Sequence, residues 1–285
     1  MRIGLRHAVL ASCLIAAVRL ALAAAPEAAR ELVFGIYPYL SPSRIVEQYA
    51  PLNDYLTQAL DRPVTLRSAP NFQKFVERTQ TGEYDIIFTA PHMGRLAEKR
   101  DGYRPVAQSG YQIVVVTLVK KDAPIHALED LRNRTLAVGS RLSMSYQIVN
   151  QALGKHGMAL ERDVRFVDTA SFSNVIEAVL RNEADAGATG TLLWDTTPPA
   201  QHAALREIFR SQAVPGFLIL VHPRVTADTV QRLGRALFAF DRTPAGRDFF
   251  ATSHQLDFRP IDAATMRRID PYTAVFDNAA PAASR

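Results

Sequence analysis

The sequence predicts an α/β protein built as two lobes, each with a mainly parallel sheet flanked by helices. Short apolar runs of strand type alternate with segments of helical periodicity, and the alternation starts again near Lys120, midway along the 285 residues. Strands that alternate with helices of about 10–15 residues are typical of parallel sheets. Because a domain usually has about 100–200 residues, the length favours two domains, or one domain split across two lobes.

The first half of the chain contains five strand-type runs, at 32–36, 64–66, 85–89, 103–108 and 112–120. Helices are expected between them, from Ser43 to Leu60, from a cap at Asn71 to Gly82, and from Pro91 to about Lys99. We expect Pro51 to kink the first helix. Pro105 places its strand at a sheet edge or in a loop, because proline has no backbone N–H for a central strand.

The second half repeats the pattern. Strands are expected at 135–138, 164–167, 184–189 and 217–221. Helices are expected at 128–131, 143–156, 171–181 and 227–240. No internal repeat of solenoid period accompanies this alternation.

The first 23 residues have the features of a secretory signal peptide. A basic start is followed by an apolar run and by Ala21-Leu22-Ala23, a small-residue cleavage signal. The uncharged stretch 8–18 is too short for a membrane anchor, which takes about 20 residues. A lipoprotein box ending at Cys13 is the less favoured alternative, because it leaves almost no apolar region before the cysteine. The protein is therefore expected in the periplasm.

Composition excludes several classes of protein. The chain has 48% hydrophobic and 21% charged residues, so it is neither disordered nor collagen-like. The leader holds three arginines and no acidic residue, and its removal lowers the net charge from +5 to +2. Without a cluster of basic and aromatic residues, nucleic acid is not an expected partner. The single cysteine lies in the leader, so the mature chain is expected to have no disulfide and no zinc site of the cysteine type.

Four segments in order resemble the periplasmic phosphate/phosphite/phosphonate-binding proteins of ABC importers, over roughly 31–272. They are Phe34-Gly35-Ile36-Tyr37-Pro38-Tyr39, the stretch Gly82-Glu83-Tyr84-Asp85-Ile86-Ile87-Phe88-Thr89-Ala90-Pro91-His92, the stretch from Leu128 to Ser145, and the stretch from Val175 to Gly187.

The resemblance implies a type II periplasmic binding protein with its ligand in a cleft between the lobes. The chain would cross between lobes near 111–119 and 214–221. Lobe 1 would comprise 30–115 and 216–275, lobe 2 would comprise 116–215, and 276–285 would be a frayed tail.

The turn from Gly139 to Tyr146, which includes Ser140, joins a strand to a helix and is the first candidate for the ligand site. Free backbone N–H groups at such a helix start hold oxyanions without lysine. The resemblance implies that Ser143 and Ser145 grip the anion, with Met144 in place of the family's threonine and Tyr146 in place of its glycine. Simple helix capping by Ser143 is the alternative. Arg141 is expected to be solvated.

Other candidates lie at the carboxyl edge of the predicted strands, where α/β sheets bind ligands. One of Tyr37 and Tyr39 is expected to face the ligand. Thr89 and His92 follow another strand, and His92 donates more strongly if protonated. Thr189 ends a third strand, whereas Asp185 at its start is expected to order a turn.

Two departures from the family pattern concern specificity. Phe172 stands where the family has a histidine, and Asn182 replaces a glycine. Phenylalanine donates no hydrogen bond. The ligand is therefore a phosphonate-like oxyanion or, as an alternative, another small organic anion that suits a more apolar pocket.

The predicted function is solute capture by a monomeric, non-catalytic protein with no cofactor, for an ABC permease. A ligand-sensing partner of a membrane histidine kinase is the alternative, which the same fold would serve. A secreted hydrolase is not favoured, because residues 139–143 lack the second glycine of a nucleophile elbow. Zinc-protease helix and phosphate-loop motifs are also absent from the sequence.

Overall fold

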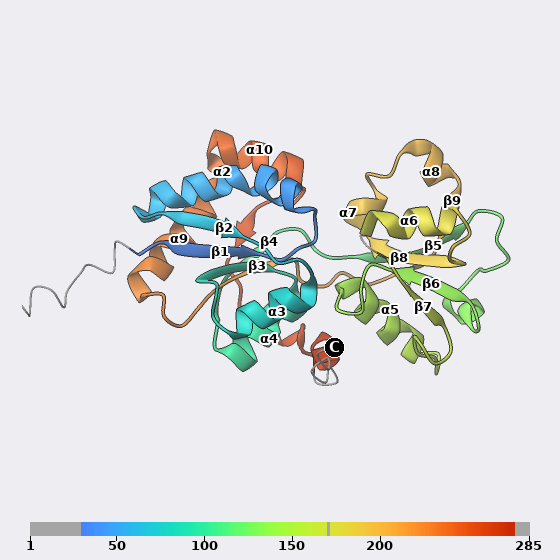
Figure 1. Cartoon of the computed structure of the whole chain (residues 1–285). Helices are drawn as coiled ribbons and strands as arrows, with labels where there is room; N and C mark the ends of the chain where they lie inside the picture. Colours follow the sequence, from blue (N-terminus) through green and yellow to red (C-terminus); the bar gives the residue numbers. More distant parts are fainter. Residues whose placement is uncertain (1–29, 170–171, 277–285) are drawn as a thin grey trace, which may run out of the picture.

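The computed structural model describes residues 30–169 and 172–276. The predicted leader with Cys13, and residues 277–285 of the predicted tail, lie outside the described residues. Two sheets lie side by side, each between layers of helices (Figure 1). The predicted two-lobed α/β architecture is thus confirmed, and we call the part around the six-stranded sheet lobe 1 and the part around the five-stranded sheet lobe 2.

Lobe 1 has the strand order β11-β4-β10-β3-β1-β2. Its strands are β1 (Leu32–Ile36), β2 (Val64–Arg67), β3 (Ile86–Thr89), β4 (Arg104–Ser109), β10 (Leu218–Val221) and β11 (Phe258–Arg259). Its main helices are α2 (Pro42–Leu60), α3 (Phe72–Gln80), α4 (Pro91–Asp101), α9 (Ala227–Ala239) and α10 (Pro244–Ser253). Helices α2 and α10 cover one face of the sheet, and α3 and α4 cover the other (Figure 1).

Lobe 2 has the strand order β7-β6-β8-β5-β9. Its strands are β5 (Val115–Lys120), β6 (Thr135–Val138), β7 (Arg165–Asp168), β8 (Ala186–Gly190) and β9 (Leu205–Arg210). Its helices are the 3-10 turn η2 (Leu128–Leu131), α5 (Met144–Gly154), α6 (Phe172–Leu180), α7 (Thr191–Trp194) and α8 (Pro199–Ala203). Helices α5 and α6 pack on opposite faces of this sheet (Figure 1).

Both sheets are mixed rather than mainly parallel. Strand β10 is antiparallel to β3 and β4, and β5 is antiparallel to β8 and β9. The physical reason is that β10 and β5 each enter their sheet from the other lobe, so they run against the strands that lead toward it. The carboxyl ends of β1 and β3 therefore point toward lobe 2, and those of β6 and β8 point toward lobe 1.

Two connecting segments, 110–114 and 211–217, join the lobes and overlap the expected crossings. They pair through Ile113 and Val214, whose backbone N–H groups each donate to the other residue's carbonyl at 3.0 and 2.9 Å. A Cβ atom at Gly216 would lie 1.9 Å from the carbonyl oxygen of Tyr111. Only glycine permits this close approach, so the pairing of the two segments depends on it.

Local sequence signals explain most element boundaries. The Asn71 side chain caps α3 by accepting from the N–H of Lys74, and Pro91 occupies the first turn of α4. The N-cap residue of helix α2 is Ser41, two residues before the expected cap Ser43, and the helix continues through Pro51. Pro105 lies in the second strand of its sheet, but β11 pairs only with the far end of β4, so the side of β4 at this proline has no partner strand.

Several elements were not expected from the sequence. They are α7, α8, β9, α10, β11, α11 (Ala263–Arg267) and the 3-10 turns η3 (Phe240–Arg242), η4 (Asp270–Tyr272) and η5 (Ala274–Phe276). Across the part of the chain that the structure describes, no helix is both long enough and apolar enough to span a bilayer.

Candidate functional site

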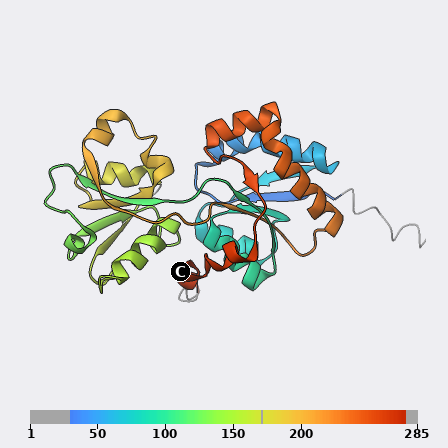
Figure 2. The ribbon, with the colours of Figure 1, turned by 180° about the vertical axis from the view of Figure 1, so that it is seen from behind.

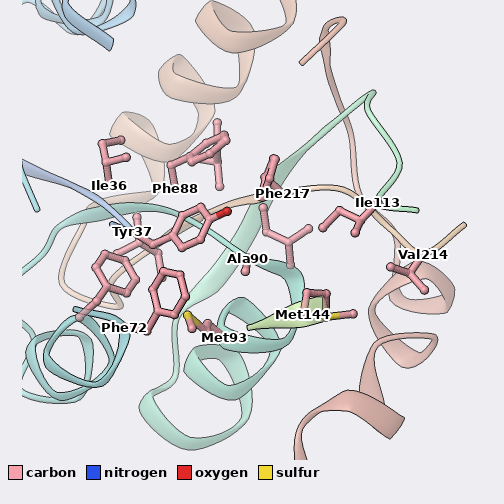
Figure 3. Close-up of a cluster of buried hydrophobic side chains, with 14 of the residues drawn as sticks. Ile36, Tyr37, Phe72, Phe88, Ala90, Met93, Ile113, Met144, Val214 and Phe217 are labelled. Carbon is pink, nitrogen blue, oxygen red and sulfur yellow. The ribbon is translucent and has the colours of Figure 1, made fainter. Parts of the chain in front are cut away.

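The two lobes meet where the carboxyl ends of their sheets face one another. Contacts between the lobes include a hydrogen bond from His92 to Leu142 and a ring contact between Phe72 and Phe172. Tyr111 of the first connecting segment is also hydrogen-bonded to Thr191 of lobe 2. We call the region around these contacts the interlobe junction. Figure 3 shows Met144, from the first turn of α5, in the same buried cluster as Tyr37, Phe72 and Met93 of lobe 1.

Tyr37 and Tyr39 follow β1 at this junction and differ in their hydroxyl contacts. The Tyr39 hydroxyl accepts a hydrogen bond from Gln48 at 2.7 Å and is bonded to the Tyr49 hydroxyl at 2.9 Å. The Tyr37 hydroxyl points toward Phe217 and Ala90 (Figure 3). Burial raises the pKa of Tyr37 well above its usual value, so this hydroxyl remains a hydrogen-bond donor. Tyr37 is the tyrosine suited to contact a ligand.

Thr89 ends β3 directly before the start of α4. Its side chain is fully buried, and its Oγ1 atom has no hydrogen-bond partner among the described residues. The first N–H groups of α4 have no acceptor within the helix, and its N-cap residue Ala90 supplies no side-chain acceptor. Buried polar atoms nearly always have a partner. This end of β3 therefore holds a buried hydroxyl group that has no partner among the described residues.

His92 is used differently from the way the sequence suggested. Its Nε2 atom lies 2.8 Å from the carbonyl oxygen of Leu142 in lobe 2. Since a carbonyl only accepts, Nε2 is the protonated nitrogen and donates to it. Burial lowers the pKa of His92 to about 4, so the ring is neutral at physiological pH. In this arrangement the neutral ring joins the two lobes through Nε2, and donation from His92 to an anion stays a prediction.

The turn between β6 and α5 satisfies some of its own polar groups. Ser143 is the N-cap of α5, and its Oγ accepts from the N–H of Tyr146 at 3.1 Å. The Ser140 Oγ accepts from the N–H of Leu142 at 3.2 Å. Ser145 is buried in the first turn of α5. Capping leaves the hydroxyl hydrogen of Ser143 available, so capping and ligand contact are compatible.

Two side chains of this turn point to Glu161 instead of offering groups to a ligand. The Tyr146 hydroxyl donates to Glu161 at 2.8 Å, so its side chain is already paired. Arg141 forms an ion pair with the same carboxylate at 2.7 Å and is 61% exposed. The solvated position expected for Arg141 is therefore observed.

Phe172 covers the carboxyl end of β6. A Cβ atom at Gly139 would lie 2.8 Å from the Phe172 ring, so the ring rests directly on the backbone of that glycine. The same ring is 6.0 Å from that of Phe72, measured between centroids. Phe172 therefore presents an apolar surface at the junction.

Thr189 is fully buried near the end of β8, and its Oγ1 atom has no hydrogen-bond partner among the described residues. Asp185, just before this strand, accepts from the N–H and the hydroxyl of Thr135 at 2.8 and 2.6 Å. It orders the turn, as expected.

The electrostatics of the junction are those of neutral donors. No lysine or arginine is buried within 30–169 and 172–276. Hydroxyl groups and helix N-termini remain as the groups that could bind an anion, and both hold oxyanions without a formal positive charge. The same residues contain no cluster of three or more His, Cys, Asp or Glu side chains that could hold a metal.

Sequence reasoning missed three aromatic residues of the junction, Phe72, Tyr111 and Phe217. The Phe217 ring lies 5.6 Å from Tyr37 and 5.7 Å from Tyr39, and it stacks on Tyr111 at 6.2 Å. Phe72 is the first residue of α3, one of the helices that the sequence predicts. The sequence gives no sign that Phe72 contacts Phe172, because the two residues lie 100 positions apart in the chain.

The chain matches the model of a known protein family, and solved structures with a similar fold exist. A family model described as "ABC transporter, phosphonate, periplasmic substrate-binding protein" matches residues 34–266. Among solved structures, XAC2383 from Xanthomonas citri bound to ATP is similar, with a TM-score of 0.77 and 24% identity over 88% of this chain and 99% of that one.

Two further structures have the same fold. PhnD1 from Prochlorococcus marinus (MIT 9301) in complex with methylphosphonate has a TM-score of 0.77 and 15% identity, and covers 87% of this chain and 98% of that one. The periplasmic aliphatic sulphonate-binding protein SsuA from Escherichia coli has a TM-score of 0.65 and 15% identity, and the match covers 87% of this chain and 92% of the SsuA chain. At these identities the structural likeness establishes the fold.

Proposed function

The chain belongs to the phosphonate-binding periplasmic substrate-binding proteins of ABC transporters, and from this premise we propose that it captures a small organic oxyanion at the interlobe junction. The family is periplasmic and delivers its solutes to ABC transporters. We propose that this chain does so as a monomer and without catalysing a reaction. Its lobes would be 30–115 with 216–275, and 116–215.

One observation carries the assignment of the ligand site. Within the described part of the chain, the buried hydroxyl groups of Thr89 in lobe 1 and Thr189 in lobe 2 have no hydrogen-bond partner. Both residues lie at or near the ends of strands directed toward the other lobe. An unpaired buried polar group costs about 1–3 kcal/mol, which a ligand oxygen would recover. The nearby starts of α4 and α5 add backbone N–H groups and the positive ends of two helix dipoles.

The apolar surface of the junction favours an oxyanion that carries an organic group. Tyr37, Phe72, Phe172 and Phe217 form a nearly continuous series of rings across it. Of the three structural relatives, one is described as a complex with methylphosphonate and one as a binder of aliphatic sulphonates, whereas the third is bound to ATP. Methylphosphonate and aliphatic sulphonates both join a tetrahedral oxyanion to a carbon atom. A phosphonate or sulfonate therefore fits better than inorganic phosphate.

Calorimetry of residues 24–285 with methylphosphonate, an alkylsulfonate, phosphite and inorganic phosphate tests this function. We expect an organic oxyanion to bind most tightly. A ligand at 100 times its dissociation constant should also stabilise the protein by about 2.7 kcal/mol in a thermal unfolding assay. If none of the four anions binds, while unrelated solutes such as amino acids do, the oxyanion assignment is wrong although the family is not.

Export is the second part of the proposal. The leader 1–23 would be removed, leaving a mature chain that starts near Ala24. Mass spectrometry of periplasmic protein distinguishes this product from a lipid-modified chain starting at Cys13. A neighbouring permease and ATPase gene would favour import, whereas a neighbouring sensor kinase gene would favour signalling.

A further inference from the structure

The end of the described chain runs back to the junction between the lobes. After α11, the turns η4 (Asp270–Tyr272) and η5 (Ala274–Phe276) lie against α4 of lobe 1, and η4 also contacts α5 of lobe 2. Figures 1 and 2 show this segment beside the junction from opposite sides. We call residues 270–276 the C-terminal strap. It lies beyond residue 266, where the match to the family ends.

Ion pairs fasten the strap to α4. Asp270 accepts hydrogen bonds from Nε and Nη2 of Arg95 at 2.7 and 3.3 Å, and it pairs with Nζ of Lys99 at 2.7 Å. Hydrogen bonds from these two cations lower the pKa of Asp270 to about 2. The Arg95 side chain is only 13% exposed, so the two-pronged contact is partly shielded from solvent.

An aromatic contact fastens the other end of the strap to the link between the lobes. The Phe276 ring is stacked on the His92 ring, with centroids 5.6 Å apart and planes at 27°. His92 is the residue that donates to the Leu142 carbonyl of lobe 2. Phe276 therefore covers one face of the ring that joins the lobes.

The strap is anchored at its start by buried side chains. Ile269 and Met266 are almost completely buried, and Arg268 donates to the carbonyl of Ala213 in the second connecting segment at 3.4 Å. These contacts tie the start of the strap to the large buried cluster and to the second connecting segment. The contact of η4 with α5 and the hydrogen bond from His92 to Leu142, in contrast, are made only while the lobes are together.

We propose that the C-terminal strap holds the two lobes closed and that Phe276 and Asp270 act as positioning residues for the contact between His92 and Leu142. Contacts that exist in one of two conformations shift the equilibrium toward that conformation by their own free energy. The strap therefore raises the closed fraction of the ligand-free protein. This regulation is independent of which ligand the site takes.

A distance measurement in the ligand-free protein tests the strap. The mature chain 24–285 has no cysteine, so spin labels at Asp54→Cys on α2 and Gln151→Cys on α5, both exposed, report the separation of the lobes. We expect wild type to have mainly the short distance. Asp270→Asn, Phe276→Ala and a chain ended after Ile269 should lower the ratio of closed to open molecules about fivefold or more.

Two controls separate the strap from general damage. A chain ended after Phe276 keeps the strap and should behave as wild type. Glu47→Gln removes an exposed ion pair with Arg44, far from the strap in sequence and in lobe 1, and should leave the label distance unchanged. Circular dichroism identifies any variant that fails to fold. If the chain ended after Ile269 does not fold, the two point variants provide the test.

The pKa of the His92 ring provides a second measurement, which a general loss of stability would not change. Ring-nitrogen NMR in wild type should give a pKa of about 4 for His92, with the proton on Nε2. In Phe276→Ala the ring is uncovered, and its pKa should rise toward the ordinary value of about 6.5. Unchanged label distances together with an unchanged His92 titration in Phe276→Ala and Asp270→Asn would overturn the proposal.

Discussion

The rings of Tyr37 and Tyr39 stack with centroids 4.9 Å apart and planes within 10° of parallel. Among the residues that the structure describes, however, only the Tyr39 hydroxyl is hydrogen-bonded to neighbouring side chains. Gln48 and Tyr49 hold that hydroxyl within lobe 1. The Tyr37 hydroxyl points into the buried cluster at the junction (Figure 3). The two tyrosines thus differ in their hydroxyl contacts, and we propose that Tyr37 is the one that contacts the ligand.

Replacing each tyrosine by phenylalanine should separate these roles. Tyr37→Phe removes a donor to the bound anion, and affinity should fall by about 1.5–3 kcal/mol, or roughly 10- to 150-fold, with little change in stability. Tyr39→Phe should lower the free energy of unfolding by about 1 kcal/mol and leave affinity unchanged. Calorimetry and chemical denaturation of both variants measure the two effects, and the reverse pattern would assign the ligand contact to Tyr39.

Ser143→Ala tests the turn before α5. Loss of the cap on the Tyr146 N–H should lower the free energy of unfolding by about 1 kcal/mol. If the hydroxyl also donates to the anion, affinity falls about 10- to 150-fold as well. Thr243→Ala is the matched control, because Thr243 caps α10 by accepting from the N–H of Gly246 in lobe 1. Thr243→Ala should lose similar stability without any loss of affinity. Equal affinities for the two variants would mean that Ser143 only caps the helix and does not contact the ligand.

Phe172→His tests the most distinct departure from the family. The new ring would stand over Gly139 with a donor at the place where the resemblance to the family implies a histidine. We expect a relative gain in affinity for phosphonates and phosphate, and a loss for ligands with larger apolar groups. Phe172→Leu, which shortens the side chain without adding a donor, separates the donor from the change of shape. Parallel affinities for the two variants would mean that Phe172 packs within lobe 2 and does not reach the ligand.

The sequence was sufficient for the elements that have strong local signals. Buried strands such as β3 and β5 are continuous apolar runs, and Asn71 and Ser143 cap helices as their positions predicted. The edge strand β9 was missed because buried and exposed positions do not alternate along it, and Arg206, Glu207 and Arg210 make it look like a surface segment. Strand direction also had to come from the structure, since a crossing chain reverses it without any local signal.

The site was predictable only in outline. Position after a strand marked Tyr37, Thr89 and Thr189, because the carboxyl ends of parallel strands meet at one edge. The pairing of His92 with Leu142 was not visible, since it depends on how two separately folded lobes meet. The same is true of the Phe276 contact, which joins the chain end to residue 92.

The buried His92 should make stability depend on pH in a defined window. Its pKa is about 4 in the folded protein and about 6.5 in the unfolded chain. Between these values the unfolded state binds a proton that the folded state does not, so the free energy of unfolding falls as the pH falls. The slope is about 1.4 kcal/mol per pH unit, and the sum over the window is about 3 kcal/mol.

Denaturation curves of wild type and His92→Gln at pH 7, 6, 5 and 4 measure this contribution. Glutamine can still donate to Leu142 but has no proton to bind, so the variant should lack the slope due to residue 92. The other histidines, including the partly buried His222, are common to both proteins and cancel in the difference. The stability difference between wild type and variant should therefore shift steadily in favour of the variant from pH 6.5 down to pH 4. If the two profiles run parallel, the ring of His92 is not buried in the neutral form, and the contact that joins the lobes does not persist in solution.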